Sequence, residues 1–280
     1  MTRPAAVICT ALAVEYNAVR AHLAGEITEH SRNGTLYEVG AFGRWTVALL
    51  QAGMGNVSTS QQLERAVAEF SPELALFVGV AGGRKDVGLG DVVAADVVYD
   101  YESGKDTESG YRPRIKTHPS SHRLVQRAQS VARQALWHRR ILPSCPAPAP
   151  QAVCKPIAAG GKVISHGSSA TARQIDQNCG DAAAVDMEGF GFLSGAHALK
   201  DVEALVIRGI SDLLSDKSFE SDQRWQPVAS AAAAAFAFEV LHREEPQRDP
   251  APPAQTNVIS AQNIYGNVIQ AGSIGQVHYH

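Results

Sequence analysis

The sequence predicts an α/β protein, a three-layer sandwich in which helices cover both faces of a mixed, largely parallel sheet. Short runs rich in Val, Ile, Leu and Ala alternate with segments of helical spacing, as parallel strands joined by helices require. Several of these runs are apolar throughout, as in strands buried on both faces. With 280 residues, 45% of them hydrophobic, the chain is long enough for one large domain of this kind.

The predicted elements follow one another from residue 5 to residue 242. The predicted strands are 5–11, 45–53, 74–83, 91–99, 155–161, 182–187 and 204–211. The predicted helices are 14–23, 57–70, 119–137, 169–177, 188–199 and 225–242. The stretch DVVAADVVYDYESG has no helix before the next strand signal, so the sheet is expected to be mixed.

Composition excludes several classes of function. The net charge of −3 and the pI of about 6.4 give no overall basic surface for nucleic acid. The four cysteines and the histidines lack metal-ligand spacing, so we expect reduced thiols, no metal and no cofactor. The N-terminus lacks a signal-peptide pattern, and no apolar run reaches the roughly 20 residues of a membrane span. We therefore expect a cytoplasmic protein without a membrane partner.

The α/β pattern ends before the C-terminus. Residues 244–255, EEPQRDPAPPAQ, are polar and rich in proline, which predicts an extended linker. Residues 257–280 contain no Asp, Glu, Lys or Arg and are rich in Val, Ile, Asn and Gln. The sequence thus predicts a catalytic domain at 1–243, a linker at 244–256 and a β-prone tail at 257–280.

The tail repeats its first phrase with a period of ten residues. NVISA at 257–261 aligns with NVIQA at 267–271. Stacked segments of like sequence gain main-chain hydrogen bonds, Asn and Gln ladders and dry Val and Ile contacts. The lack of charge removes the usual protection against edge-to-edge pairing. The tail therefore favours assembly; a disordered tail, or a hairpin docked on the domain, is the alternative.

Polar or glycine-rich residues follow four of the predicted strands. Glu15 comes just past the first strand, and Gly55 lies in the turn GMGN. Glu188 follows the strand ending in VDM, and Ser211 and Asp212 end the strand ALVIRGIS. Ligands of open α/β sheets bind where strands end. Each residue alone could be a solvated acid, a turn or a helix cap, but together they indicate one polar site.

These motifs, with VGVAGG and GLGDVV, resemble the nucleoside phosphorylase/nucleosidase superfamily over residues 5–241. The pattern is most similar to that of methylthioadenosine and S-adenosylhomocysteine nucleosidases. The resemblance implies that Asp212 is the general acid at purine N7, oriented by Ser211. It implies that Glu15 holds and deprotonates the attacking water. Both roles suit an oxocarbenium-like transition state, which needs a protonated leaving group and a positioned nucleophile.

The resemblance also implies a substrate pocket. Glu188 would bind the ribose hydroxyls, with Met187 under the sugar. Further substrate contacts are expected at Gly55, Val80, Ala81, Gly82 and Val163. Val163 stands where methylthioadenosine nucleosidases place an aromatic residue against adenine, so the base pocket is expected to differ. Phosphorylases of the superfamily carry a phosphate-binding arginine where this chain has Phe77, which favours hydrolysis over phosphorolysis.

Basic residues near the expected pocket leave two interpretations open. Arg84, Lys85, Lys105 and Lys162 are either solvated loop charges or a cradle for the phosphates of a nucleotide such as ATP. The last helix is similar to nucleosidase-type domains of immune receptors and conflict systems. A purine nucleotide hydrolase that acts as a defence effector is therefore our first hypothesis. A constitutive nucleosidase or phosphorylase of nucleoside salvage is the alternative, and a catalytically inactive binding module is a weaker one.

The tail resembles bacterial amyloid signalling motifs related to the RIP homotypic interaction motif, on the residues VIQAGSIG and GQVHYH. The resemblance implies a homo-oligomer whose partner is a nucleotide-binding receptor with a similar motif. Assembly of tails would concentrate the catalytic domains.

Overall fold

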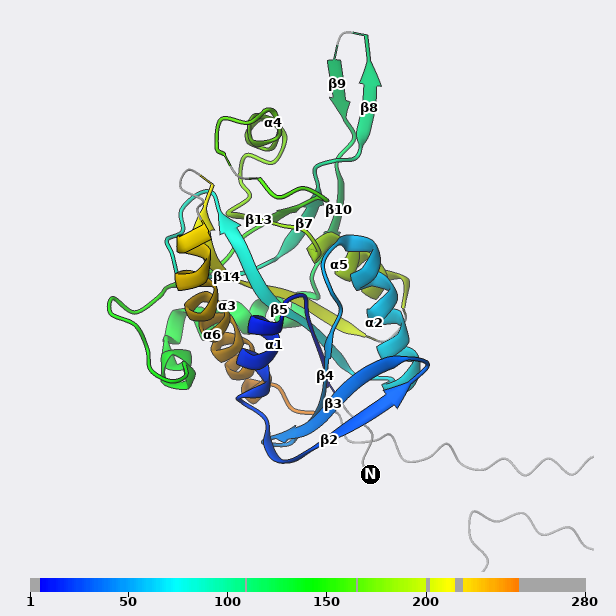
Figure 1. Cartoon of the computed structure of the whole chain (residues 1–280), viewed down its shortest axis with the longest axis vertical. Coiled ribbons are helices and arrows are strands. Elements are labelled where there is room, and N and C mark those ends of the chain that lie inside the picture. The colour runs from blue at the N-terminus through cyan, green and yellow to red at the C-terminus, as the bar shows by residue number, and fades with distance from the viewer. Residues whose placement is uncertain (1–5, 109, 165, 200–201, 215–218, 247–280) are drawn as a thin grey trace, which may run out of the picture. The chain divides into compact units, whose positions relative to one another are not determined.

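The computed structural model describes residues 6–246, except 109, 165, 200–201 and 215–218 (Figure 1). The predicted tail and all but the first residues of the predicted linker lie outside the described residues. Glu244 is buried and pairs with Arg123 and Arg127, while Glu245 pairs with Arg44. The start of the predicted linker is therefore held on the domain, which ends at Pro246.

The strands and helices agree with the predicted α/β alternation (Figure 1). The strands are β1 Ala6–Thr10, β2 Ala24–Arg32, β3 Thr35–Phe42, β4 Trp45–Gln51, β5 Leu74–Gly83, β6 Val92–Ala94, β7 Val97–Asp100, β8 Gly104–Thr107, β9 Gly110–Pro113, β10 Lys116–Pro119, β11 Ala152–Cys154, β12 Ile157–Ala159, β13 Ala184–Asp186 and β14 Glu203–Leu213. The helices are α1 Ala13–Arg20, α2 Asn56–Phe70, α3 His122–Gln134, α4 Ala170–Asn178, α5 Gly189–Ala198 and α6 Phe219–Arg243, with the 3₁₀ helix η1 at Leu136–Arg140.

The main sheet has 12 strands in the described part of the chain and is mixed, as predicted. Its central path runs β10-β7-β12-β13-β5-β1-β4-β3-β2. At the centre, β1 lies parallel to β4 and β5, and β14 lies parallel to β5. The strand β13 pairs antiparallel with the last residues of β5, which in turn pair with the end of β14 that carries Ser211 and Asp212.

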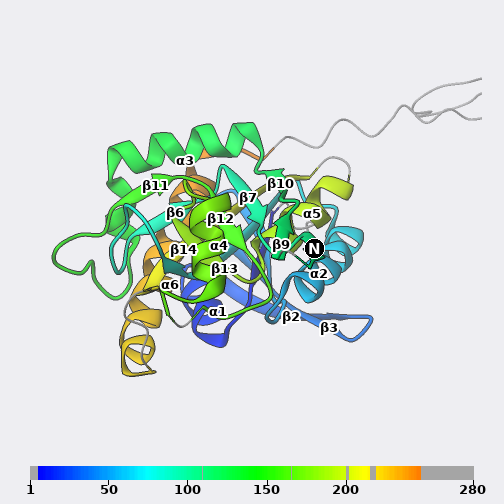
Figure 2. The same cartoon turned by 90° about the horizontal axis from the view of Figure 1, so that it is seen from above.

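Helices cover the sheet on both faces, which confirms the predicted three layers. Alternate residues of β1 belong to two separate cores: Ala6 and Ile8 face one, Val7 and Cys9 the other. The first core contains side chains of α1, α3 and α6, and the second contains side chains of α2 and α5. Seen from above, α2 and α5 lie together on one side of the sheet (Figure 2).

Two hairpins were missed by the sequence prediction. The strand β2 is mostly polar and partly exposed, and β3 is interrupted by Glu38, so neither contains a long apolar run to reveal it. The hairpin β8–β9 is charged and exposed, and it extends away from the main sheet (Figure 1). Strand pairing with exposed side chains is decided by the partner strand rather than by local hydrophobicity.

Three predicted boundaries were wrong. The single strand expected at 91–99 is divided into β6 and β7, and β6 pairs antiparallel with β14. The helix expected at 119–137 ends at Gln134, because Ala135 adopts a left-handed conformation before η1 begins. The last helix begins earlier than expected, at Phe219.

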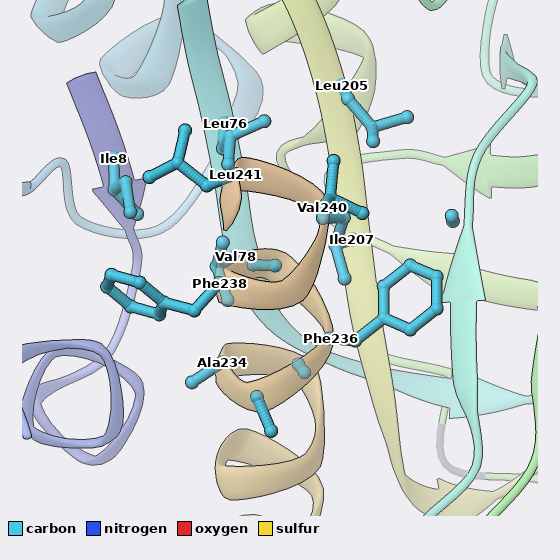
Figure 3. Close-up of a cluster of buried hydrophobic side chains, with 14 of the residues drawn as sticks. Ile8, Leu76, Val78, Leu205, Ile207, Ala234, Phe236, Phe238, Val240 and Leu241 are labelled. Atoms are coloured by element: carbon cyan, nitrogen blue, oxygen red, sulfur yellow. The ribbon is translucent and has the colours of Figure 1, made fainter. Parts of the chain in front are cut away.

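The alanine-rich end of the domain is a buried helix, as predicted. Phe236 and Phe238 project from opposite sides of α6 among side chains of β1, β5 and β14 (Figure 3). A β-carbon on Gly209 of β14 would overlap the carbonyl oxygen of Ala229, so the helix backbone packs directly on this glycine. No helix in the described residues is long and apolar enough to cross a membrane. The four cysteines are free.

We expect Phe236→Ala to lower the free energy of unfolding by about 3–5 kcal/mol, because it leaves a cavity beside the buried Trp137 ring. The ring centroids of Phe236 and Trp137 lie 5.5 Å apart. Guanidinium denaturation measures the change. Leu136→Ala is the control, since Leu136 is 39% exposed and its loss should cost less than about 1 kcal/mol. Equal losses in the two variants would contradict this assignment of the core.

Candidate active site

The predicted acids come together at one cavity. Glu15 lies in the first turn of α1, Glu188 lies between β13 and α5, and Asp212 lies near the end of β14. All three are buried. The cavity is lined by Ala11, Leu12, Glu15, Met54, Val80, Ala81, Gly82, Lys162, Val163, Ile164, Val185, Asp186, Met187, Glu188, Ser211, Asp212, Leu214 and Gln226. Ten of the predicted site residues are therefore neighbours, although they come from segments far apart in the sequence.

Glu15 is held by backbone amides from two strand ends. Its Oε2 accepts hydrogen bonds from the amides of Ala11 and Leu12 at 2.7 and 2.8 Å. Its Oε1 accepts one from the amide of Val80 at 2.8 Å. Burial raises the pKa of the Glu15 carboxyl, although Arg208 and the three amides act in the opposite direction. The carboxyl is thus fixed in position and has a raised proton affinity.

Arg208 is fully buried in the middle of the apolar strand β14. Its Nε and Nη2 each lie 2.8 Å from Asp186 Oδ2, and Nη2 lies 3.4 Å from Glu188 Oε2. Its guanidinium stacks on the Phe77 ring, with 4.1 Å from Cζ to the ring centroid. Burial by itself lowers the pKa of Arg208, but Asp186, Glu188 and Glu15 raise it further than burial lowers it. Arg208 therefore remains charged among three carboxyl groups.

A glycine makes room for this cluster. Gly79 of β5 pairs with Arg208 of β14 across the sheet. A β-carbon on Gly79 would collide with Arg208 Nη1 and lie 2.6 Å from Glu15 Oε1. Since no other residue type lacks a β-carbon, only glycine allows Arg208 and Glu15 to approach each other here.

Glu188 lies at the cavity wall between the Arg208 guanidinium and the backbone amide of Gly55. Its Oε1 accepts a hydrogen bond from the amide of Gly55 at 3.0 Å. The predicted GMGN turn therefore contributes to the site by holding the Glu188 carboxyl group. Burial raises the pKa of Glu188 to about 7. Arg208 and the Gly55 amide lower this pKa, whereas Asp186 and Glu15 raise it.

An irregular step in β14 turns two successive residues toward the cavity. The pairing of β14 with β5 shifts by one residue between Ile210 and Asp212, which is a β-bulge. Ser211 and Asp212 both line the cavity as a result, although successive residues of a regular strand face opposite sides. The Ser211 hydroxyl donates to Asp212 Oδ2 at 3.1 Å.

The four basic residues considered as phosphate contacts are dispersed. The Arg84 side chain pairs with Asp176 at 2.8 Å, donates to the carbonyls of Gly180 and Ala182, and so holds the end of α4. Lys85 and Lys105 are exposed and are absent from the cavity lining. Lys162 does line the cavity, and its Nζ lies 3.0 Å from Glu102 Oε1.

The residues expected to contact base and sugar surround the acids. Val80, Ala81, Gly82 and Met187 line the cavity, and Val163 lies at its mouth with 61% exposure. The sequence interpretation missed two site residues, Arg208 and Asp186. A signal for Arg208 was present, because a charged residue in the apolar run ALVIRGIS must be paired when the strand is buried.

Residues 5–242 match the sequence model of the phosphorylase superfamily. The chain belongs to this superfamily. The predicted family is thereby confirmed for the whole α/β domain.

Relatives and solved structures of this superfamily are distant in sequence. The chain is 25% identical over 241 residues to a death domain-containing ATP nucleosidase of Amphimedon queenslandica, covering 80% of this chain and 44% of that protein. It is 27% identical over 209 residues to the ATP nucleosidase Cap17 of Escherichia coli, covering 68% of this chain and 40% of that protein. The chain thus spans less than half the length of these two relatives.

The fold agrees with that of a crystal structure of a methylthioadenosine/S-adenosylhomocysteine nucleosidase. The enzyme of Colwellia psychrerythraea, in complex with adenine, superimposes with a TM-score of 0.72 at 20% identity, covering 86% of this chain and 96% of that one. This likeness establishes the fold, and the chemistry of the site has to be argued from its own residues.

We expect Glu188→Gln to raise the free energy of unfolding at pH 8 by about 3–3.5 kcal/mol, because one pKa unit corresponds to about 1.4 kcal/mol. Burial raises the pKa of Glu188 from 4.5 to about 7, so the folded protein bears a costly charge above pH 7. The gain should vanish near pH 4, where the carboxyl is neutral in both states, and grow as the pH rises to 7. Urea denaturation at both pH values measures it, and a pH-independent difference would contradict the assignment.

Proposed function

We propose that the chain is a nucleosidase that hydrolyses the N-ribosidic bond of an adenine nucleoside or nucleotide. The convergence of Glu15, Glu188 and Asp212 on one cavity is the observation that supports this proposal best. Bond cleavage needs an acid at the base, a base at the water and a group that holds the sugar between them. The three carboxyl groups come from the start of α1, the start of α5 and the end of β14, and they can serve these three roles.

The proposed reaction is a displacement at C1′ of the ribose. The bond between C1′ and N9 breaks, and its electron pair moves into the purine. Asp212, oriented by the Ser211 hydroxyl, delivers a proton to N7, so adenine leaves as a neutral base. Water attacks C1′ from the opposite face and loses a proton to Glu15. Glu188 accepts hydrogen bonds from the ribose hydroxyls. The products are adenine and the free ribose or ribose phosphate.

Two features of the site favour water over phosphate as the nucleophile. Glu15, Asp186 and Glu188 surround a single buried arginine, so carboxyl groups outnumber the cation where the nucleophile would approach. An anionic phosphate is disfavoured in such a field, whereas water is neutral. The ring of Phe77 occupies the position at which phosphorylases carry their arginine, and it packs under Arg208.

An adenine nucleotide such as ATP is the substrate class we favour. The two relatives named above are ATP nucleosidases. Lys162 lines the cavity and supplies a cation that a phosphate could attract away from Glu102. Arg84 is committed to α4, which weakens its candidacy as a phosphate contact. A methylthioadenosine nucleosidase of nucleoside salvage is the second candidate, supported by the fold of the C. psychrerythraea enzyme.

Adenine release decides between these substrates. We expect the full chain to release adenine from ATP or AMP without inorganic phosphate, as followed by chromatography. Asp212→Asn should lower kcat by a factor of about 10²–10⁴, the usual contribution of a general acid. Asp86→Asn is the matched control, since Asp86 pairs with Lys155 at 2.6 Å and does not line the cavity.

Each other outcome contradicts a part of the proposal. Release from methylthioadenosine alone would eliminate the nucleotide substrate. A requirement for added phosphate would make the enzyme a phosphorylase. Full activity in Asp212→Asn would remove the proposed acid.

We further propose that the enzyme is an effector of a bacterial defence or cell-death system. Its uncharged tail at 257–280 would assemble with a receptor carrying a similar motif. The A. queenslandica relative is named for a death domain as well as for ATP nucleosidase activity, so that protein joins a nucleosidase to a further domain. Assembly would concentrate the catalytic domains.

Truncation after Pro246 tests the role of the tail. This position retains Glu244 and Glu245, which are paired with arginines of the domain. We expect fibrils of the peptide 257–280 to drive the full chain into thioflavin-positive assemblies and to leave the truncated chain monomeric. A peptide that forms no fibrils at high concentration would contradict the proposal. Equal recruitment of the full and the truncated chain would contradict it as well.

A further inference from the structure

Asp186 is a buried acid that the reaction described above does not use. It ends β13 and lies two residues before Glu188. Its carboxylate accepts hydrogen bonds from Arg208 Nε at 2.8 Å and from the amide of Gly189 at 3.0 and 3.2 Å. Its backbone carbonyl accepts a hydrogen bond from the amide of Gly160, which begins the loop carrying Lys162 and Val163. Asp186 therefore contacts two neighbours of Glu188, the Arg208 guanidinium and the Gly189 amide.

We propose that Asp186 is a positioning residue: by holding Arg208 and the first turn of α5, it fixes Glu188 for the ribose hydroxyls and keeps Arg208 from pairing fully with Glu188. The inference rests on the proposed nucleosidase function.

The distances around Arg208 decide which carboxylate is its main partner. Nη2 lies 2.8 Å from Asp186 Oδ2 but 3.4 Å from Glu188 Oε2. The first distance is that of a strong charge-assisted hydrogen bond, whereas the second is at the limit for hydrogen bonding. Arg208 is thus neutralised mainly by Asp186. The Glu188 carboxylate therefore remains able to accept hydrogen bonds from the two hydroxyls of a ribose.

The second contact of Asp186 fixes the backbone of Glu188. The Gly189 amide is the first of α5, and the Asp186 carboxylate satisfies it as a helix cap does. A β-carbon on Gly189 would lie 2.7 Å from Asp186 Oδ2, so the glycine permits this short approach. Glu188 directly precedes Gly189, and its side chain projects toward Gly55 and Arg208.

A simple helix cap would explain the Gly189 contact but not the contact with Arg208. The two roles differ in their effect on the ionisation of Glu188. The groups that act on Glu188 are Arg208 of β14, Asp186 of β13, Glu15 of α1 and the Gly55 amide at the start of α2. Burial and the two acids raise its pKa, while Arg208 and the amide lower it. Loss of the Asp186 charge removes one raising influence and frees Arg208 to approach Glu188, so both effects lower the pKa.

The pH profile of kcat/KM tests this inference in the full chain. For the wild-type enzyme we expect activity to fall on the acid side near pH 7, where Glu188 loses its charge. In Asp186→Asn this limb should move to lower pH by at least about one unit, the usual effect of a neighbouring charge. At pH 8.5 its KM should rise about tenfold or more, with a smaller change in kcat, because the ribose contact is loosened.

The control is Asp86→Asn, which removes an aspartate paired with a cation outside the cavity and should leave profile and KM unchanged. An unchanged acid limb in Asp186→Asn, with only a lower melting temperature, would overturn the proposal and leave Asp186 as a helix cap. If Asp186→Asn does not fold, Gly189→Ala displaces the same carboxylate without removing any charge. It should shift the limb in the same direction, and an unshifted limb in a folded Gly189→Ala protein would overturn the proposal.

Failure of the nucleosidase function can be told apart from failure of this inference. A wild-type chain that releases adenine from none of ATP, AMP and methylthioadenosine contradicts the proposed function. The inference is then measured by carboxyl ¹³C NMR, with the Glu188 signal assigned by its loss in Glu188→Gln. A Glu188 titration that moves to lower pH in Asp186→Asn supports the contact network, and an unmoved titration overturns it.

Discussion

The site depends on one buried cation, Arg208, held against Asp186 beneath the cavity. An unpaired charge at this depth would cost several kcal/mol, so the strand that carries it can be buried only if carboxylates meet it there. Asp186 supplies the close ion pair, while Phe77 covers the flat face of the guanidinium. The remaining two acids, Glu15 and Glu188, are then arranged around a charge that is already neutralised.

The fold brings these groups together because several strand ends meet at one place. The central strands β1, β5 and β14 run parallel, so Glu15 and Asp212 follow strands that end at the same edge of the sheet. The antiparallel pairing of β13 with β5 brings Glu188 to that edge. Glycine at position 79 leaves space for Arg208 and Glu15, and the bulge in β14 turns both Ser211 and Asp212 toward the cavity.

The same arrangement makes the acids chemically unequal. Burial raises the pKa of both Glu15 and Glu188, but the amides that bind Glu15 counteract this effect, and Arg208 counteracts it at both. Carboxyl groups crowded around one arginine are unfavourable for stability and useful for a reaction that needs a proton acceptor and a sugar-binding group close together. The basic residues are distributed differently: Arg84 serves the fold by holding the end of α4, and Lys162 alone of the four considered lines the cavity.

By itself, the sequence determined the α/β class, the buried strands, the superfamily and the positions of the three acids, because apolar runs and short motifs at their ends are local signals. It did not reveal β2 and β3, which join the main sheet through the pairing of β3 with β4, or the exposed hairpin β8–β9. The tertiary structure alone decided that Arg208 pairs with Asp186, that Gly79 makes room for Glu15, and that Arg84 points to α4. These contacts join residues from distant segments of the chain, and such a contact leaves no periodic pattern in either segment.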